Sequence, residues 1–173
     1  GAYLVEESPN GGVVLMEESV RLAVLADAEV LGWLVAGARA ELPDKKGGDV
    51  VQRLDPHRVD PSARVMAAVE DPDTTVLLGC IDGTPVGYGL MTVASVSDGS
   101  LQATVDELFV DPEARSVGVG EAIIEALKAD AMERGAVAIQ STALPGDRAT
   151  KNFFESQGMV ARAIIVHRWL DGR

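Results

Sequence analysis

The sequence contains few of the residues on which disulfides, metal centres and aromatic cores depend. Among 173 residues it has one cysteine, two histidines and 4% aromatic side chains. The single cysteine, Cys80, excludes an intrachain disulfide and a cysteine-based metal cluster. His57 and His167 lie far apart in the sequence and in different surroundings, so we expect no metal site.

Basic residues and long apolar runs are scarce as well. Lys and Arg number 15 against 27 Asp and Glu, which gives a formal net charge of −12. This balance argues against general nucleic-acid binding, which needs a basic surface, but is compatible with a cationic amine substrate. No run approaches the roughly 20 apolar residues of a membrane span, and the chain does not open with a basic stretch followed by an apolar one. We therefore expect a soluble, cytoplasmic protein that binds neither nucleic acid nor membrane.

The hydrophobic residues that are present make up 47% of the chain and suffice for the core of a single domain over residues 1–173. The tetrapeptide Pro9 to Gly12 indicates a turn, and we expect a loose arm as far as residue 19. The first strand lies at residues 13–16 or at residues 20–23, because the apolar pattern fits both.

Helical spacing dominates the part of the chain that follows. Residues 25–42 carry one apolar stripe and predict a helix that faces the core. Residues 43–49 predict a loop, and Asp-Pro pairs at Asp55 and Asp60 mark irregular chain. A short helix is expected over residues 61–69.

The centre of the chain predicts an antiparallel meander. Strands at residues 75–81 and 85–96 flank Asp82-Gly83, which is a strong signal for a two-residue hairpin, and a third strand follows at residues 101–110. A helix over residues 117–134 then leads to a strand at 136–144. Because that connection is a crossover, we expect this last strand to pair in parallel with the strand at 101–110.

The C-terminal part predicts one more helix and one more strand. Residues 148–157 form the helix, which ends at Gly158, and residues 159–170 form an apolar strand. An unpaired apolar strand at a sheet edge invites association. We therefore expect a second subunit to cover it or to complete the substrate pocket, which would make the protein a homodimer.

The most informative stretch is residues 105–127, which reads as strand, turn and helix. A helix start exposes unpaired N–H groups at the positive end of the helix dipole, so it attracts anions. Gly118 and Gly120 leave those N–H groups open, and Arg115 adds a positive charge beside them. The turn lacks the third glycine of a dinucleotide fold and the Gly-Lys-Ser/Thr of a P-loop. It therefore predicts a phosphate site of another kind.

Arg115-x-x-Gly118-x-Gly120, directly after Leu-Phe-Val-Asp-Pro, resembles the pyrophosphate-binding motif of the GNAT superfamily of N-acyltransferases. A second stretch, residues 147–159, is similar to the GNAT segment Asn-x-x-Ala-x-x-Leu-Tyr-Glu-x-x-Gly-Phe. The resemblance implies an α/β (α+β) fold. Its mixed, mostly antiparallel central sheet would be flanked by helices and would carry a splayed strand pair at the site of the cofactor, acetyl-CoA.

The resemblance also implies which residues meet the cofactor. Backbone groups late in the splayed strand would contact the pantetheine arm, the turn would hold the pyrophosphate, and side chains of the late helix would approach the sulfur. These residues are Leu108, Phe109, Val110, Arg115, Ser116, Val117, Gly118, Val119, Gly120, Asn152 and Phe154. An unpaired N–H of the strand would also stabilise the oxyanion of the reaction.

Transfer to an amine needs a group that removes a proton, because an alkylamine with a pKa near 10 is almost wholly protonated at neutral pH. Glu107 is the first candidate for this base and Asp106 the second. Strict alternation would place them on opposite faces, but the GNAT strand usually carries a bulge here. Phe154 stands where the family has a tyrosine that protonates the leaving thiolate, so Tyr88 is the candidate substitute.

Together these features predict an N-acetyltransferase that moves an acetyl group from acetyl-CoA directly to a primary amine of a small molecule or a peptide. Cys80 has no histidine neighbour in sequence, which argues against an acyl-enzyme. The alternative is an acyl-CoA-binding sensor or partner subunit that catalyses little. The missing tyrosine favours this alternative, whereas Glu107 beside the thioester end disfavours it.

Overall fold

The computed structural model describes residues 3–7, 13–54 and 60–171. In these residues six strands follow one another across the sheet in sequence order: β1 (Tyr3–Glu7), β2 (Val13–Leu22), β3 (Thr74–Ile81), β4 (Thr84–Ser95), β5 (Leu101–Val110) and β6 (Ala136–Ser141). The pairs from β1 to β5 are antiparallel, and β6 joins β5 in parallel. The mixed, mostly antiparallel sheet and the parallel crossover are therefore confirmed.

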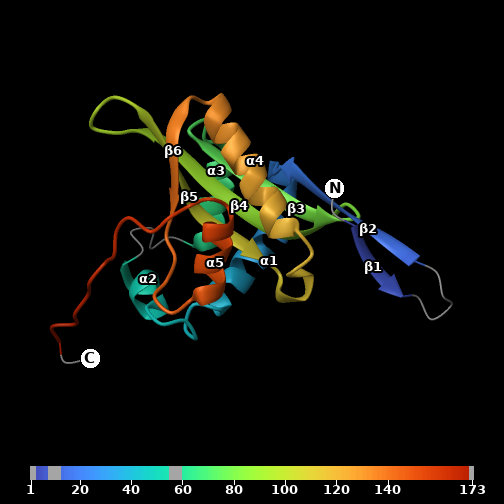
Figure 1. Cartoon of the computed structure of the whole chain (residues 1–173), viewed down its shortest axis with the longest axis horizontal. Helices are drawn as coiled ribbons and strands as arrows, with labels where there is room; N and C mark the ends of the chain where they lie inside the picture. Colours follow the sequence, from blue (N-terminus) through green and yellow to red (C-terminus); the bar gives the residue numbers. More distant parts are fainter. Residues whose placement is uncertain (1–2, 8–12, 55–59, 172–173) are drawn as a thin grey trace.

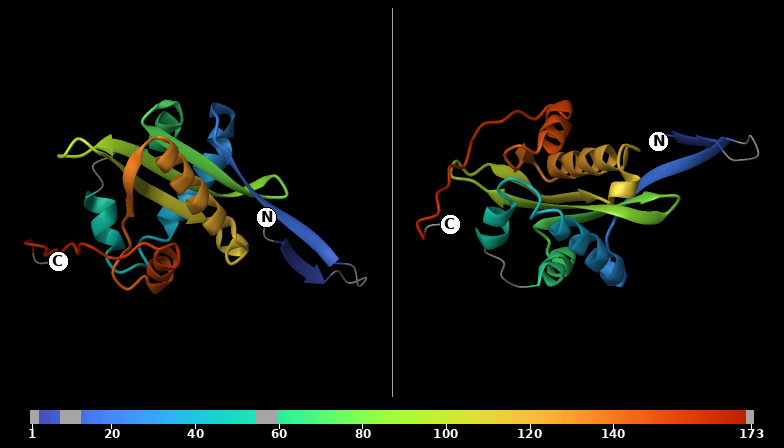
Figure 2. Two further views of the ribbon diagram at one scale, coloured as in Figure 1. Left: turned by 45° about the horizontal axis from the view of Figure 1, so that its top comes forward. Right: turned by 90° about the horizontal axis from the view of Figure 1, so that it is seen from below.

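Helices cover both faces of the sheet (Figure 2). α1 (Ala28–Ala40), α2 (Gly48–Leu54) and α3 (Pro61–Glu70) lie on one face, and α4 (Val119–Glu133) and α5 (Arg148–Ser156) lie on the other. Each face has its own apolar core. The first includes Leu31, Leu34, Val35, Val65, Tyr88, Leu90 and Phe109, and the second includes Met91, Val105, Ile123, Ile124, Leu127 and Phe154.

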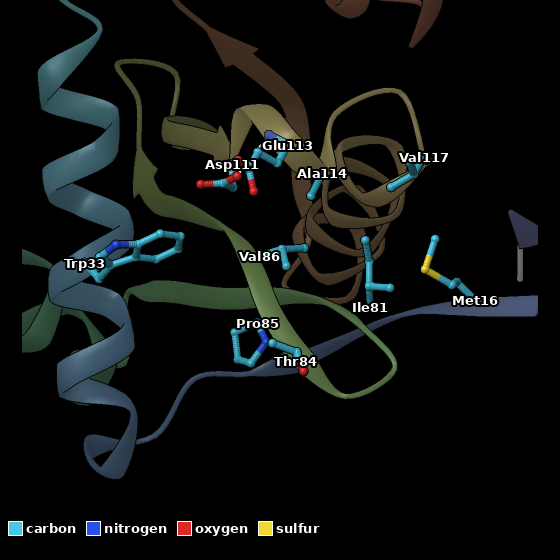
Figure 3. A pocket seen from close by; sticks show the side chains of 10 residues that line it. All are labelled: Met16, Trp33, Ile81, Thr84, Pro85, Val86, Asp111, Glu113, Ala114 and Val117. Atoms are coloured by element: carbon cyan, nitrogen blue, oxygen red, sulfur yellow. Dashed lines mark hydrogen bonds between the residues drawn. The ribbon is translucent and has the colours of Figure 1, made fainter. Parts of the chain in front are cut away.

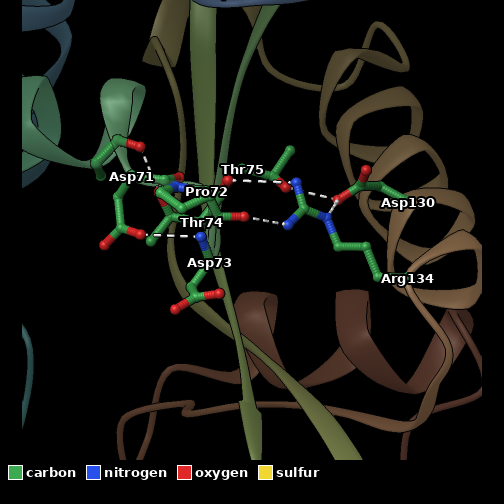
Figure 4. Close-up of polar contacts among 8 residues, drawn as sticks. Asp71, Pro72, Asp73, Thr74, Thr75, Asp130 and Arg134 are labelled. Carbon is green, nitrogen blue, oxygen red and sulfur yellow. Dashed lines mark hydrogen bonds and ion pairs between the residues drawn. The ribbon is translucent and has the colours of Figure 1, made fainter.

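Helix α4 packs unusually close to the sheet because glycines lie beneath it. A Cβ atom built on Gly79 of β3 would lie 2.5 Å from Val119, and one on Gly89 of β4 would lie 2.6 Å from Ile123. Arg134, at the end of α4, donates to the Pro72 carbonyl and pairs with Asp130 at 2.8 Å (Figure 4). These contacts fix the direction of α4 and with it the position of the turn at its N-terminus.

Several boundaries and turns agree with the sequence-based predictions. The strand at 101–110 has the predicted bounds, and Asp82 and Gly83 adopt φ angles of 48° and 78°, as a primed hairpin turn requires. β2 contains the segment 13–16 and residues 20–22 of the alternative segment 20–23, but it is the second strand, because β1 precedes it. No helix in the described ranges is long and apolar enough to cross a membrane.

The N-terminal segment is not a loose arm where the structure describes it. β1 pairs with residues 13–17 of β2, and the remainder of β2 pairs with β3. The β1–β2 hairpin projects beyond the rest of the sheet (Figure 1). Two strands can pair through backbone hydrogen bonds without burying both faces in a core. The polar composition of this segment therefore did not exclude a strand, and the prediction of a loose arm was wrong.

One short helix was missed and one predicted strand is wrong. Residues 43–47 form the expected loop, but residues 48 and 49 belong to α2, which the sequence analysis did not predict. Residues 159–170 form no strand, and the segment runs outward. The guanidinium carbon of Arg53, in α2, lies over the Trp169 ring at 4.8 Å from its centroid. A strand requires a neighbouring edge, which periodicity cannot supply. Asp55 and His57 lie outside the described residues.

Candidate functional site

The site begins where β5 and β6 part. Their pairing runs from Leu101↔Ala136 to Val105↔Ser141, where β6 ends, while β5 continues to Val110. The N–H of Asp111 donates to the Val86 carbonyl of β4 at 2.8 Å. Since backbone groups alternate along a strand, the N–H groups of Val110 and Leu108 point away from β4, toward the side where β6 has ended. An extended ligand can pair with β5 there.

A β-bulge in β5 decides the facing of the two candidate carboxylates. Leu90 of β4 is opposite Glu107, but Met91 is opposite Val105, so Asp106 is the extra residue. Glu107 consequently contacts α1 and α3. Asp106 lies on the same face of the sheet, where it lines a groove next to α3. The bulge thus brings onto one face two side chains that strict alternation would separate.

Glu107 is held by three side chains. Its Oε1 accepts hydrogen bonds from Arg39 of α1 at 3.0 Å and from Arg64 of α3 at 2.9 Å, and its Oε2 accepts one from the Tyr88 hydroxyl. Burial raises the pKa of Tyr88 far above its usual range, and the neighbouring Glu107 carboxylate raises it further. Tyr88 therefore keeps its proton and donates a hydrogen bond to Glu107, so we do not assign it the role of general acid.

Asp106 has a different environment. It is exposed, and its Oδ2 accepts a hydrogen bond of 2.6 Å from the Thr92 hydroxyl. It borders a groove of about 640 Å³ between α3 and strands β4 and β5. The groove is lined by Ala63, Arg64, Ala67, Ala68, Asp71, Thr74, Leu90, Thr92, Ala94, Thr104 and Asp106. Of the two carboxylates, Asp106 is the one that a ligand in this groove can reach.

The turn between β5 and α4 has the backbone of an anion site. Ser116 and Gly118 adopt left-handed φ angles of 69° and 90°, and Gly118 is the N-cap of α4. Such turns direct successive N–H groups toward one point. The φ of Gly118 is one that side-chain-bearing residues rarely adopt, and a Cβ there would also displace the end of the Glu18 side chain. The free edge of β5 therefore leads directly into a turn whose backbone can bind an anion.

Arg115 lies in the turn but its guanidinium is already engaged. Nε donates to the Val110 carbonyl at 2.9 Å, and a second nitrogen pairs with Glu41 at the end of α1. The guanidinium carbon also lies 5.6 Å from the centroid of the Phe109 ring. The side chain therefore connects the turn to α1.

Helix α5 places its residues differently from the expectation. Phe154 is buried in the α4-side core, and Asn152 is exposed. The side chain beside the turn is Phe153, which would lie 3.5 Å from a Cβ on Gly120. Phe153 and Phe154 meet edge to face with centroids 5.5 Å apart. Sequence reasoning selected Phe154 by its position in the motif and missed its neighbour.

A second hollow of about 500 Å³ borders the same turn (Figure 3). Its lining comes from α1, β2, the β3–β4 hairpin and the segment after β5, with the exposed Trp33 at one end. Asp111 and Glu113 belong to this lining, which includes no lysine or arginine. The hollow is thus unsuited to phosphate groups.

Neither a cysteine nucleophile nor a metal site is supported in the described part of the chain. Cys80 is buried, and burial raises the pKa of its thiol, which keeps it from acting as a nucleophile. Within residues 3–7, 13–54 and 60–171, no three His, Cys, Asp or Glu side chains group as a metal site would need.

With this geometry in view, comparison with known proteins identifies the family. Residues 41–159, more than half of the chain, match the model of the acetyltransferase (GNAT) family. The protein belongs to this family. A search of curated protein sequences found no match.

Solved structures share the fold at low sequence identity. A tetramutant of the BH1408 protein from Bacillus halodurans has a TM-score of 0.75 at 21% identity, with 88% of this chain and 99% of that chain covered. An aminoglycoside acetyltransferase, meta-AAC0020, from an uncultured soil metagenomic sample has a TM-score of 0.66 at 17% identity, covering 88% and 94%. A ribosomal-protein-alanine N-acetyltransferase from Brucella melitensis biovar Abortus has a TM-score of 0.65 at 20% identity, covering 88% and 100%.

The structure adds residues that the sequence analysis did not select: Arg39, Arg64, Glu41, Lys45 and Phe153. Arg39 carried a usable signal. It follows Val35 by four residues, so it lies on the buried stripe of α1, where a charged side chain needs a partner. Its partner, Glu107, is 68 residues away in the chain and could not be identified without the fold.

Proposed function

We propose that this GNAT protein transfers the acetyl group of acetyl-CoA to a primary amine of a small cationic molecule. The observation that supports this best concerns β5. Beyond Val105 the N–H groups of Leu108 and Val110 point to the side where β6 has ended, and the bulge turns Asp106 toward a groove on the α3 face. The edge of β5 would thus bind the acetyl donor, and the face of the same strand would bind the amine that accepts the acetyl group.

The cofactor supplies an acetyl group activated as a thioester. The chain's contribution is to hold it. Backbone N–H groups of Leu108 and Val110 would pair with the pantetheine arm and with the acetyl oxygen, since no strand among the described residues pairs with them. The N–H groups from Ser116 to Gly120 would bind the pyrophosphate at the positive end of α4. Phe153 would cover the turn from the side of α5.

We propose that Asp106 accepts the proton that the amine must lose. The amine nitrogen needs a free lone pair, and Asp106 is the accessible carboxylate next to the splay. The Thr92 hydroxyl orients Asp106. Glu107 already accepts hydrogen bonds from Arg39, Arg64 and Tyr88, so we assign it the role of fixing α1 and α3 to the bulge.

The groove and the net charge favour a cationic acceptor. Arg64 is the only basic side chain in the groove lining and is paired with Glu107, which leaves Asp71 and Asp106 to determine the charge seen by a ligand. The protein as a whole carries −12. Two of the structural relatives are named for aminoglycoside and protein-alanine acetylation, and both names imply amine acceptors.

The test is a thiol-release assay with acetyl-CoA and a panel of polyamines, aminoglycosides, amino acids and peptide amines, followed by mass spectrometry of the products. Thiol release that depends on a cationic amine, with the acetyl group found on its nitrogen, is the expected result. Tight acetyl-CoA binding without release to any amine would favour the alternative, an acyl-CoA sensor or partner subunit.

A further inference from the structure

Four charged side chains form a continuous series beside the turn between β5 and α4. Arg115 pairs with Glu41, whose other oxygen lies 3.5 Å from the Lys45 ammonium. Lys45 in turn lies 3.0 Å from Asp147. The signs alternate along the series, so Arg115 and Lys45 each have a carboxylate of the chain as a partner.

This series connects the turn after β5 with the turn after β6. Arg115 belongs to the turn after β5, and Asp147 is the N-cap of α5 in the turn after β6. The segment after α1 also packs on the second turn, because a Cβ on Gly47 would lie 3.5 Å from the Pro145 ring. Glu41 and Lys45 therefore bridge the two turns.

We propose that Glu41 sets the affinity of the protein for the phosphate groups of CoA by occupying Arg115 until they bind. This inference rests on the proposed function, which places the phosphates at this turn. Arg115 and Glu41 are 44% and 24% exposed, so an incoming anion can reach both partners. A phosphate group offers more negative charge and more acceptor oxygens than a carboxylate, and guanidinium binds it in the same planar geometry.

The exchange has a defined consequence for the charges. Once phosphate replaces Glu41 on Arg115, Glu41 keeps only Lys45, which already pairs with Asp147. A negative side chain then remains next to a bound polyanion, and this repulsion lowers the affinity. Removal of the Glu41 charge should therefore strengthen CoA binding, whereas a purely structural ion pair would weaken it when broken.

The experiment is a calorimetric titration of CoA into the wild type, Glu41→Gln and Glu41→Asp at low and at high salt. Exposed ion pairs contribute about 0.2–1 kcal/mol, so Glu41→Gln should bind CoA about 1.4- to fivefold more tightly. The gain should shrink at high salt because screening weakens the competition. Glu41→Asp retains the charge and should bind no more tightly than the wild type.

Glu125→Gln is the matched control, because Glu125 pairs with Lys128 on an exposed face of α4. It should leave the affinity unchanged. Equal or weaker binding by Glu41→Gln would overturn this inference alone. Absence of CoA binding by the wild type would instead contradict the proposed function.

Discussion

At the scale of single residues, the site depends on one extra residue in one strand. The bulge at Asp106 brings two neighbouring carboxylates to the same face and gives them different partners. Glu107 receives two guanidinium groups and a phenol, and Asp106 receives one hydroxyl. The division of roles between a fixed carboxylate and an available one follows from these contacts.

Asp106→Asn tests this division. Loss of the proton acceptor should lower kcat about a hundredfold or more, since general bases contribute factors of that size, and CoA affinity should stay unchanged. The measurement is the rate of thiol release at saturating amine near neutral pH, with CoA titration alongside. Asp73→Asn, at an exposed carboxylate, is the control. An unchanged kcat in Asp106→Asn would exclude Asp106 as the base.

At the scale of elements, an ion pair fixes the entrance to α1, the helix that carries Arg39 and precedes Glu41. Asp27 accepts the N–H of Val24 at 2.9 Å and pairs with Arg21 at 2.7 Å. The hydrogen bond from Arg21 lowers the pKa of Asp27 from 3.8 to about 2, and the Val24 N–H contributes. Because the folded pKa lies below the unfolded one, this stabilisation is complete above pH 3.8 and is lost as the pH falls toward 2.

Asp27→Asn should therefore destabilise the protein in a pH-dependent way. The exposed position of Arg21 limits the loss to about 0.5–1 kcal/mol of unfolding free energy near neutral pH. Urea unfolding curves of the two proteins should converge as the pH approaches 2. Glu133→Gln, on the exposed side of α4, should match the wild type at every pH. A difference between Asp27→Asn and wild type that persists undiminished at low pH would show that the ion pair is not its cause.

At the scale of the whole molecule, the conspicuous feature is an apolar segment without cover. Ile164, Ile165 and Val166 are 84%, 78% and 90% exposed, and the segment that holds them is paired with no strand of the described chain. β6, at the end of the sheet, presents Val137 at 74% exposure. Such surfaces favour association between chains.

We accordingly predict a homodimer whose interface includes this segment. Burying one such side chain contributes about 1.5–3 kcal/mol, so Ile165→Asp should raise the dimer dissociation constant at least tenfold. Sedimentation velocity at micromolar concentration measures it, with Met132→Lys, an exposed apolar residue of α4, as the control. A wild type that sediments as a monomer would remove the prediction.

The sequence was sufficient wherever structure depends on local pattern. Alternation and the Asp82-Gly83 turn predicted the meander, and the spacing of Gly118 and Gly120 predicted the turn that begins α4. It was insufficient where partners are distant. Arg39 and Arg64 reach Glu107 across 68 and 43 residues, and the segment expected to be a strand at 159–170 does not pair with the edge strand β6. The facing of Asp106 required the register of β4, which no short pattern encodes.

The central claim, that the turn before α4 and the free edge of β5 hold acetyl-CoA, is tested most directly by titrating CoA into the wild type and Gly120→Val side by side. A Cβ at position 120 meets Phe153 at an ordinary 3.5 Å, and valine suits a helix better than glycine, so the variant should fold. Its additional methyl groups would stand before the N–H groups of the turn. We predict binding of one CoA per chain by the wild type and none by Gly120→Val at equal thermal stability. Equal binding by both proteins, or none by the wild type, would contradict the account.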